Sequence, residues 1–289
     1  MIRVFGLLVL LSMTIAPFTG TNFAIAGDAK AKLPTEGPPF TFFAMDTGLR
    51  GADVPDLKSK VALLKKLGYA GIGYTYNPRE LPKLLELLDA QGLELSALYM
   101  SPAIEDRLDP TLAETVKLLK GRRTRLEMAL RSKKSRPSDP TGDGQAVALL
   151  RQLSDLVGDT GPVVSVYPHT NFWAERVEDG IRLAQKVERK NVGTHFNLVH
   201  WKWVKQTRDL PDLLKDARPH LMCVTVNGLA GKQIVSLEKG DHDIDVFLKL
   251  LKNTGYRGPV GLQGYSVPGP SAEHLGRSIM RWQDAMKKL

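Results

Sequence analysis

Hydrophobic positions along this chain follow two alternating spacings. Short runs rich in β-branched and aromatic residues are each followed by a stretch in which apolar residues recur every three or four positions. The first such pair is "FTFFAMD", residues 40–46, and "LKSKVALLKKLG", residues 57–68. The same order is repeated along the rest of the chain. It predicts β-strands that alternate with amphipathic helices.

The predicted elements form eight strand–helix units. The expected strands are residues 40–46, 71–77, 93–100, 124–131, 162–169, 192–200, 220–228 and 258–266. The expected helices are residues 57–68, 79–92, 112–119, 145–157, 176–189, 209–217, 243–255 and 272–289. Strand–helix alternation implies parallel strands with right-handed crossovers, and eight units in roughly 250 residues are typical of a barrel. The predicted fold class is therefore α/β, a single (β/α)8 TIM barrel.

The main alternative is a doubly wound open sheet. That fold carries a glycine-rich phosphate-binding turn after its first strand. Here the first strand runs into "MDTGLRGAD", residues 45–53, which lacks the glycine spacing of that turn. The sequence therefore favours the barrel.

The first 26 residues are typical of a cleavable signal peptide. Arg3 precedes an apolar run, residues 4–17, and Ala24-Ile25-Ala26 fits the small-x-small pattern before a cleavage site. An uncleaved membrane anchor is the alternative, but the apolar run is short for a membrane span. We expect a signal peptide at residues 1–26, a linker at 27–39 and the barrel at 40–289. The mature protein would then be periplasmic or secreted.

Basic residues are concentrated between Lys117 and Arg136, and the formal net charge of the chain is +9. Such a stretch is compatible with nucleic acid, with anionic sugars or cell-surface polymers, or with a plain solvated face. An exported protein rarely meets nucleic acid, and we favour the solvated face. The single cysteine, Cys223, excludes an internal disulfide, so the stability must come from the core.

Candidate functional side chains are expected at the carboxyl ends of the strands, where TIM barrels place their sites. Strand alternation turns Leu126, Met128 and Leu130 toward the outer helices, and Glu127 and Arg131 toward the barrel. An internal salt bridge between Glu127 and Arg131 is favoured over a catalytic acid with its anchor. The polar residues that the same argument brings together at the later strand ends are Tyr167, His169, Asn197, His200, Asn227 and Gln263.

Large aromatic residues follow two of these strand ends. They are Phe172, Trp173, Trp201 and Trp203. Aromatic faces beside amide and imidazole groups suit a sugar, whose C–H faces stack while its hydroxyl groups need donors and acceptors. Packing under a loop is the alternative for each tryptophan alone. The cluster as a whole favours carbohydrate binding, with Trp173 and Trp201 among the binding residues.

The remaining histidines receive no catalytic role. His195 is expected to be a hydrogen-bonded core residue, because it lies deeper in its strand. The histidines expected at the surface are His220, His242 and His274. The acidic stretch "GDHDID", residues 240–245, resembles a calcium loop but lacks the later ligand spacing, and a helix cap explains it better.

Three stretches of the sequence are similar to one known family. They are "YPHTNFWAERVEDGIRLAQKV", residues 167–187, "GTHFNLVHW", residues 193–201, and "GLQGY", residues 261–265. The chain resembles the xylose isomerase-like TIM barrels of the sugar phosphate isomerase/epimerase superfamily. This resemblance implies a divalent metal held at the ends of strands five to eight by Glu, Asp, His and Glu. It also implies a substrate-contacting His three residues after the Asp.

The four metal-ligand positions carry other residues in this chain. The resemblance places them on Tyr167, Asn197, Thr225 or its neighbour, and Gln263, and the substrate-contacting His on His200. A hard divalent cation prefers anionic oxygens, and these four side chains bring none. We therefore expect no metal and no other cofactor.

The sequence favours an exported sugar isomerase or epimerase that moves a proton next to the carbonyl of a free sugar or glycoside. His169 and His200 would transfer the proton, and Arg131 or Lys133 would stabilise the enediolate in place of the metal. The alternatives are a non-catalytic carbohydrate-binding barrel and a lyase or hydrolase that acts on an oxidised sugar. The expected partner is a small carbohydrate, with no nucleic acid and no membrane after signal cleavage.

Overall fold

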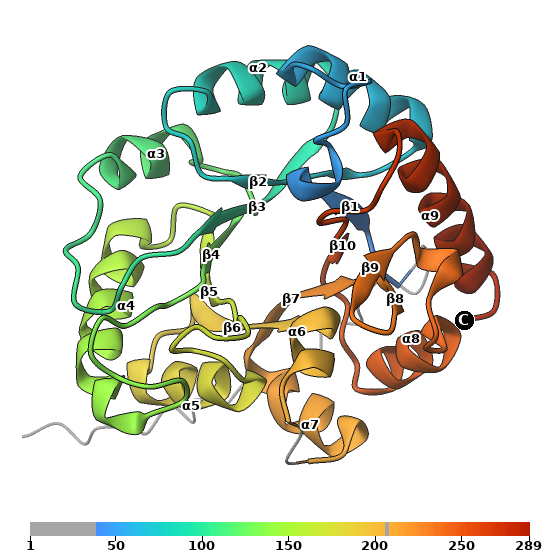
Figure 1. The fold of residues 1–289 in the computed structure, drawn as a ribbon. Coiled ribbons are helices and arrows are strands. Elements are labelled where there is room, and N and C mark those ends of the chain that lie inside the picture. The colour runs from blue at the N-terminus through green and yellow to red at the C-terminus, as the bar shows by residue number, and fades with distance from the viewer. Residues whose placement is uncertain (1–38, 206–207) are drawn as a thin grey trace, which may run out of the picture. The chain divides into compact units, whose positions relative to one another are not determined.

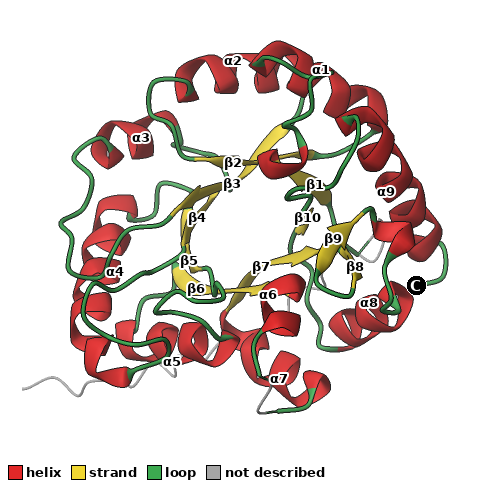
Figure 2. Ribbon diagram, in the orientation of Figure 1, coloured by secondary structure: helices red, strands yellow, loops and turns green. Residues whose placement is uncertain are grey.

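Parallel strands close into a barrel that is surrounded by helices (Figure 1, Figure 2). This computed structural model describes residues 39–205 and 208–289, and the predicted signal peptide and the linker up to residue 38 lie outside them. The barrel strands are β1 (Phe42–Met45), β2 (Gly71–Thr75), β3 (Glu94–Met100), β4 (Arg125–Met128), β5 (Val163–Val166), β6 (Val192–Asn197), β7 (Leu221–Val226) and β10 (Val260–Leu262). The predicted (β/α)8 barrel is confirmed, and the alternative of an open sheet is wrong.

Closure of the barrel comes from the pairing of its first and last strands. β10 lies between β7 and β1, and Phe42 of β1 is in register with Val260 of β10. Trp282, on the last helix, stacks on Phe42 with ring centroids 4.0 Å apart and planes 2° from parallel. The two ends of the strand–helix series are thus joined both by backbone hydrogen bonds and by aromatic packing.

The helices form the outer ring that Figure 2 shows in red. They are α1 (Leu57–Leu67), α2 (Leu81–Gln91), α3 (Leu112–Leu118), α4 (Asp143–Val157), α5 (Val177–Val187), α6 (Leu198–Trp203), α7 (Leu210–Ala217), α8 (Ile244–Asn253) and α9 (Ser271–Met286). Asp243 accepts hydrogen bonds from the amides of Asp245 and Val246 and so caps α8, as expected for the acidic stretch. No helix of the described residues is long and apolar enough to cross a membrane.

The main core lies between the strands and the helices. Leu126, Met128 and Leu130 are buried in it, which confirms the predicted outward face of the fourth strand. A second, smaller cluster fills the barrel itself and includes Phe43 and Cys223. The barrel is therefore packed rather than open, and any site must lie at an end of the strands.

Two elements were not expected from the sequence. α6 begins directly after Asn197, where the sequence predicted three more strand residues. The strands β8 (Gly228–Ala230) and β9 (Gln233–Val235) form an antiparallel hairpin that turns at Gly231, whose φ is +61°. Both elements follow the carboxyl ends of barrel strands, so they shape the mouth of the barrel.

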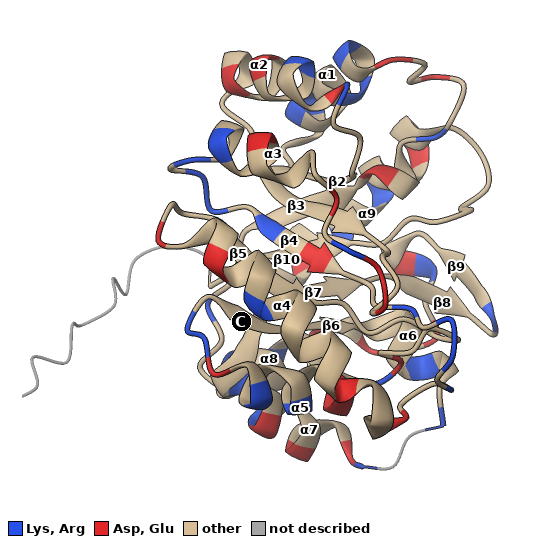
Figure 3. Ribbon diagram, turned by 90° about the vertical axis from the view of Figure 1, so that its left-hand side faces the viewer, with Lys and Arg blue, Asp and Glu red and all other residues tan. Residues whose placement is uncertain are grey.

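Some basic residues of the stretch 117–136 are paired with acidic neighbours. Lys117 contacts Glu114 at 2.7 Å, and Lys133 contacts Asp106 at 2.5 Å. Figure 3 shows lysine and arginine interspersed with aspartate and glutamate over the helices. These pairs are what a solvated face would show.

Candidate functional site

A cavity of about 380 Å³ opens at the carboxyl ends of the barrel strands. Of the predicted site residues, Tyr167, His169, His200 and Gln263 line it. Tyr167 and His169 follow β5, Gln263 follows β10, and His200 lies on α6, the helix that follows β6. The closed barrel brings these strand ends to one mouth. The cavity has the size of a small-ligand pocket. Among the residues that the structure describes, no aspartate or glutamate lines it.

Asn197 is the helix cap of α6 and not a lining residue. Its side-chain oxygen accepts hydrogen bonds from the backbone amides of Val199, at 3.0 Å, and His200, at 3.2 Å. Asparagine is a preferred N-cap residue because its short side chain reaches these amides. Since a backbone N–H can only donate, the oxygen must face the helix. The NH2 group is therefore the part that points to Tyr167, to whose hydroxyl it donates.

Tyr167 places a protonated hydroxyl at the floor of the cavity. The side chain is buried, and burial raises the pKa of its hydroxyl well above the ordinary value, so the group is neutral. Its oxygen accepts hydrogen bonds from Asn197 and, at 3.4 Å, from the side-chain nitrogen of Gln263. Two donors occupy the lone pairs of the hydroxyl oxygen. The hydroxyl hydrogen is left to donate to a group in the cavity.

The ring nitrogens of His169 and His200 are fixed in different roles by Thr170. Nδ1 of His169 lies 2.8 Å from the carbonyl oxygen of Thr170, which can only accept, so this nitrogen carries a hydrogen. Nδ1 of His200 lies 3.5 Å from the backbone N–H of Thr170, which can only donate, so this nitrogen carries the lone pair. In the neutral rings, Nε2 of His169 is therefore a proton acceptor and Nε2 of His200 a donor.

The two imidazoles are held close together and neutral. Their ring centroids are 3.9 Å apart. Burial lowers the pKa of His169, and it lowers the pKa of His200 well below its usual value, with the neighbouring His169 and His195 adding to the effect. A proton on one ring would disfavour a proton on the other. Near neutral pH the pair is therefore one base and one hydrogen-bond donor.

We expect the free energy of unfolding to fall as the pH drops below about 6.5, the pKa of a free histidine. Below that pH the unfolded chain binds a proton at His200, while the folded chain does not until its own, lower pKa is reached. The unfolded state then binds more protons, so acid favours it. Urea titrations between pH 7 and pH 5, alongside NMR of the histidine rings, would measure this. A His200 ring that titrates at its ordinary pKa would contradict it.

Below the cavity, Glu127 and His195 form a buried pair in the barrel interior. Glu127 Oε1 lies 2.9 Å from Nδ1 of His195, and Nε2 of His195 lies 2.9 Å from Thr225 Oγ1. All three side chains are fully buried. His195 is thus a hydrogen-bonded core histidine, as predicted. Ligand atoms of Glu127, His195 and Cys223 lie within 4.8 Å of one another, but a metal there would displace the partners of the histidine.

The predicted salt bridge between Glu127 and Arg131 is wrong. Glu127 lies on the strand and faces His195 across the barrel, whereas Arg131 lies beyond the strand end and is exposed. Nε of Arg131 donates to the carbonyl of Ser101 at 2.9 Å, and its guanidinium lies 5.8 Å from the centroid of Phe172. Phe172 in turn stacks on His169 at 4.0 Å. Arg131 is therefore separated from the cavity by Phe172, and Lys133 is paired with Asp106.

Besides Asn197, three further predicted binding residues lie outside the cavity. Trp173 is buried under a loop, where its Nε1 donates to the carbonyl of Asp139 at 2.9 Å. Trp201 packs against Phe196 on the helix side, with ring centroids 6.0 Å apart. Asn227 is fully buried, and its nitrogen donates to the next carbonyl in the chain. Both tryptophans thus pack against the protein, which is the alternative to carbohydrate binding that the sequence left open for each of them.

His274, which was expected at the surface, is buried within α9, so that prediction is wrong. The amphipathic spacing places this position on the inner face of its helix. His220 and His242 are half-buried.

Several lining residues were not chosen from the sequence. They are Thr47, Arg50 and Thr75, while Tyr99, Trp203 and Tyr265 complete the polar and aromatic part of the lining. Arg50 is the most consequential of them, because it brings a positive charge to the cavity from the loop after β1. Nothing in the local sequence distinguishes Arg50 from other loop arginines. Trp203, by contrast, is the last residue of α6 and belongs to the aromatic cluster that the sequence indicated, and Tyr265 follows β10.

A family model described as xylose isomerase-like TIM barrel matches residues 61–286. This span includes seven of the eight barrel strands and both His169 and His200. The chain belongs to this family. No curated protein matches the sequence. The resemblance inferred from the sequence is thus confirmed.

Solved structures of sugar epimerases share the fold. D-allulose 3-epimerase from Methylomonas sp., in complex with D-allulose, is 16% identical with a TM-score of 0.67, over 85% of this chain and 97% of that one. 3-Keto-D-glucoside 4-epimerase from E. coli is 16% identical with a TM-score of 0.68, over 86% of this chain and 100% of that one. The IOLI protein, solved with a zinc atom, is 17% identical with a TM-score of 0.68, over 86% and 99%. These likenesses show that the chain shares its fold with the three proteins.

Proposed function

We propose that this protein is a sugar isomerase or epimerase that acts on a free sugar or glycoside by proton transfer next to a carbonyl, without a divalent metal. The observation that carries this proposal is the pair His169 and His200, which Thr170 fixes as one proton acceptor and one donor at the mouth cavity. Acid–base chemistry at a carbon next to a carbonyl needs these two functions side by side. The likeness to sugar epimerases supports the substrate class.

In the proposed reaction, Nε2 of His169 removes a proton from the carbon next to the carbonyl. The electron pair of the broken C–H bond forms a C=C bond, and the carbonyl oxygen takes up the negative charge. The hydroxyl of Tyr167 and Nε2–H of His200 donate hydrogen bonds to that oxygen, and Arg50 adds a positive charge. When His169 returns the proton to the former carbonyl carbon and the neighbouring hydroxyl passes its proton to the charged oxygen, the product is an isomer. When water delivers a proton to the opposite face of the original carbon, the product is an epimer, and His169 releases its proton to solvent.

The residues at the family's metal-ligand positions do not fit a divalent cation. Tyr167 is protonated, and the oxygen of Asn197 is held by two amides of α6. The oxygen of Gln263 accepts a hydrogen bond from Thr47. Each oxygen is neutral and already engaged, whereas a hard cation needs free and preferably anionic oxygens. The proposed reaction therefore has no step that involves a metal.

We expect that prolonged dialysis against EDTA leaves sugar binding and turnover unchanged. The double variant Asn197→Asp/Gln263→Glu should acquire weak Mn²⁺ affinity, because each change adds an anionic oxygen near the cavity. Calorimetric titration with Mn²⁺ and metal analysis of the dialysed protein measure both effects. Stoichiometric Mn²⁺, Co²⁺ or Zn²⁺ that resists dialysis and is required for activity would refute the metal-free proposal.

The proposed proton transfer can be tested in D2O. The protein is incubated there with a panel of aldoses, ketoses and glycosides that contain an oxidised carbon. We expect deuterium, detected by NMR, at a carbon next to a carbonyl in at least one sugar, followed by an isomer or epimer. Each sugar first passes a thermal-shift screen, so that binding is recorded separately from exchange. Binding without any exchange would rule out the enzymatic proposal.

A non-catalytic carbohydrate-binding barrel is the second candidate function. It is favoured by the absence of aspartate and glutamate from the described lining of the cavity, since carboxylates are common proton-transfer groups in enzymes. Tyr167 and the two histidines would then only orient sugar hydroxyls. The exchange experiment separates the two candidates, because only an enzyme labels the sugar.

We further propose that the protein is exported after cleavage at about Gly27. The support is the sequence pattern of residues 1–26 alone, which lies outside the described residues. An exported protein would meet free sugars and glycosides in preference to intracellular phosphorylated ones. Expression in a bacterial host, fractionation and mass spectrometry of the N-terminus measure this. Periplasmic or secreted material that begins at Met1 would contradict it.

A further inference from the structure

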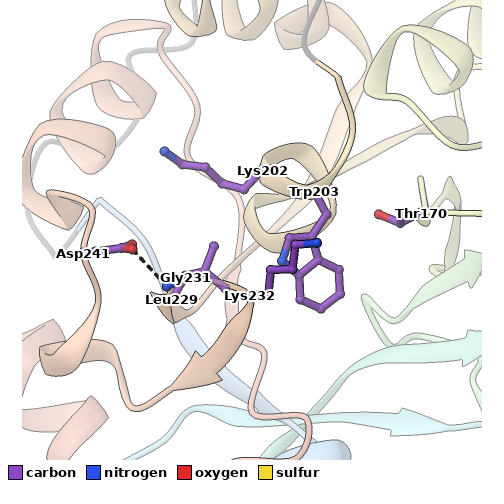
Figure 4. A pocket seen from close by; sticks show the side chains of 7 residues that line it. All are labelled: Thr170, Lys202, Trp203, Leu229, Gly231, Lys232 and Asp241. Atoms are coloured by element: carbon purple, nitrogen blue, oxygen red, sulfur yellow. Dashed lines mark hydrogen bonds between the residues drawn. The ribbon is translucent and has the colours of Figure 1, made fainter.

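A second hollow of about 720 Å³ lies beside the mouth cavity, between α6 and the β8–β9 hairpin (Figure 4). We call it the hairpin groove. α6 contributes Lys202 and Trp203 to it, and the hairpin turn contributes Gly231 and Lys232. In Figure 4, Trp203 stands between Thr170 on one side and the hairpin residues on the other. The groove is thus built by the two elements that the basic strand–helix pattern does not require.

Trp203 lines both the mouth cavity and the hairpin groove. Its side chain is 40% exposed, and its ring meets that of His200 edge-on with centroids 5.9 Å apart. A ligand unit in the mouth cavity would therefore lie next to this ring, and an attached unit could extend along it into the groove. An exposed indole face suits the C–H face of a sugar ring.

The charge of the hairpin groove is positive. Among the described residues, neither the Lys202 nor the Lys232 ammonium forms an ion pair with a carboxylate. The one acidic lining residue, Asp241, accepts a hydrogen bond from the backbone of Gly231 at 3.2 Å and so is held at the hairpin turn. Two lysines from different elements thus line the groove together with one carboxylate, and the Lys202 ammonium lies 5.4 Å from the centroid of the Trp201 ring. An anionic group would find complementary charge here.

We propose that the hairpin groove binds the second unit of a glycoside and that this unit carries an anionic substituent. The proposal rests on the proposed function for the sugar that occupies the mouth cavity. The mouth cavity, at about 380 Å³, accommodates one sugar unit, and the groove accommodates the next one along Trp203. Lys202 and Lys232 act as flexible point charges, so they recognise a carboxylate, sulfate or phosphate by its charge rather than by its geometry.

The test is an array of oligosaccharides printed in matched neutral, uronic acid, sulfated and phosphorylated forms, probed with the full chain. We expect anionic forms to bind about tenfold more tightly than their neutral counterparts, as two exposed ion pairs would give. The preference should shrink as salt is added. The variant Lys202→Gln/Lys232→Gln should bind both forms equally. The three anionic arms show which substituent the groove selects.

The matched control is Lys65→Gln/Lys66→Gln, which removes two exposed lysines from α1 and leaves the groove unchanged. It should keep the preference of the parent protein. Equal binding of neutral and anionic forms by the parent protein, no binding to any glycan, or a preference that survives in Lys202→Gln/Lys232→Gln would each overturn the proposal.

The array needs no turnover, so the two proposals can fail separately. Anionic preference without deuterium exchange into any sugar would leave the groove in place and remove the isomerase. Deuterium exchange into single sugars without anionic preference would support the isomerase and refute the proposed role of the groove.

Discussion

The variant His169→Gln is expected to lower the rate of deuterium exchange into the substrate by about 10²–10⁴-fold, the usual contribution of a general base. Glutamine keeps a hydrogen-bonding side chain of similar reach but cannot accept a proton. The structure leaves Nε2 of His169 as the proton acceptor because Nδ1 is bound to the carbonyl of Thr170. NMR detection of exchange in D2O, together with the apparent affinity for the sugar, measures the effect.

The control is His220→Asn, which changes a half-buried histidine in the turn before β7, at the far end of the barrel. It should leave exchange unchanged. The loss in His169→Gln should appear in kcat with a KM within a few-fold of the parent value, since a base acts in the transition state. Exchange within tenfold of the parent rate in His169→Gln would sink the proposed role.

The variant His195→Leu is expected to lower the free energy of unfolding by about 1–3 kcal/mol, the typical cost of leaving a buried polar group without its hydrogen-bond partner. Glu127 is fully buried and relies on His195 at Oε1, and its Oε2 has no hydrogen-bond partner among the described residues. Leucine fills a similar volume, so the loss reports the unpaired carboxyl more than a cavity. Urea unfolding followed by circular dichroism measures it.

The double variant Glu127→Leu/His195→Leu should regain much of this stability, because the buried carboxyl that lost its partner is then removed as well. Lys83→Gln is the matched surface case. Its partner Glu86 is 68% exposed, and the pair should contribute less than about 1 kcal/mol. A cost for His195→Leu as small as that of Lys83→Gln would mean that the buried pair contributes little.

The strands and long helices could be predicted from the sequence because their apolar spacing extends over many residues. α5, predicted at 176–189, runs from Val177 to Val187, and α8, predicted at 243–255, runs from Ile244 to Asn253. α6 and the β8–β9 hairpin are too short for such a period to show. Asn197 also fits both a strand end and a helix cap, and only the amides of α6 decide between them.

The cavity could be predicted where strand direction alone sets the side chain. Tyr167 and Gln263 point inward because neighbouring strand residues alternate. The side-chain direction of a loop residue does not follow such an alternation. Trp173 turns away from the cavity because the carbonyl of Asp139 accepts its N–H, and Arg131 turns away because it packs on Phe172. Arg50 enters the cavity from a loop whose path depends on the whole barrel.

Asn197 has a further consequence, for how such a barrel can change its chemistry. An aspartate at this position could still cap α6, because a carboxylate oxygen accepts from the same two amides. It could not donate to Tyr167, however, and the tyrosine would turn its own hydrogen toward the carboxylate and away from the cavity. Codons for asparagine and aspartate differ by one nucleotide. A single mutational step would therefore exchange a hydrogen-bond donor for an anionic ligand while the helix, and with it the fold, stays intact.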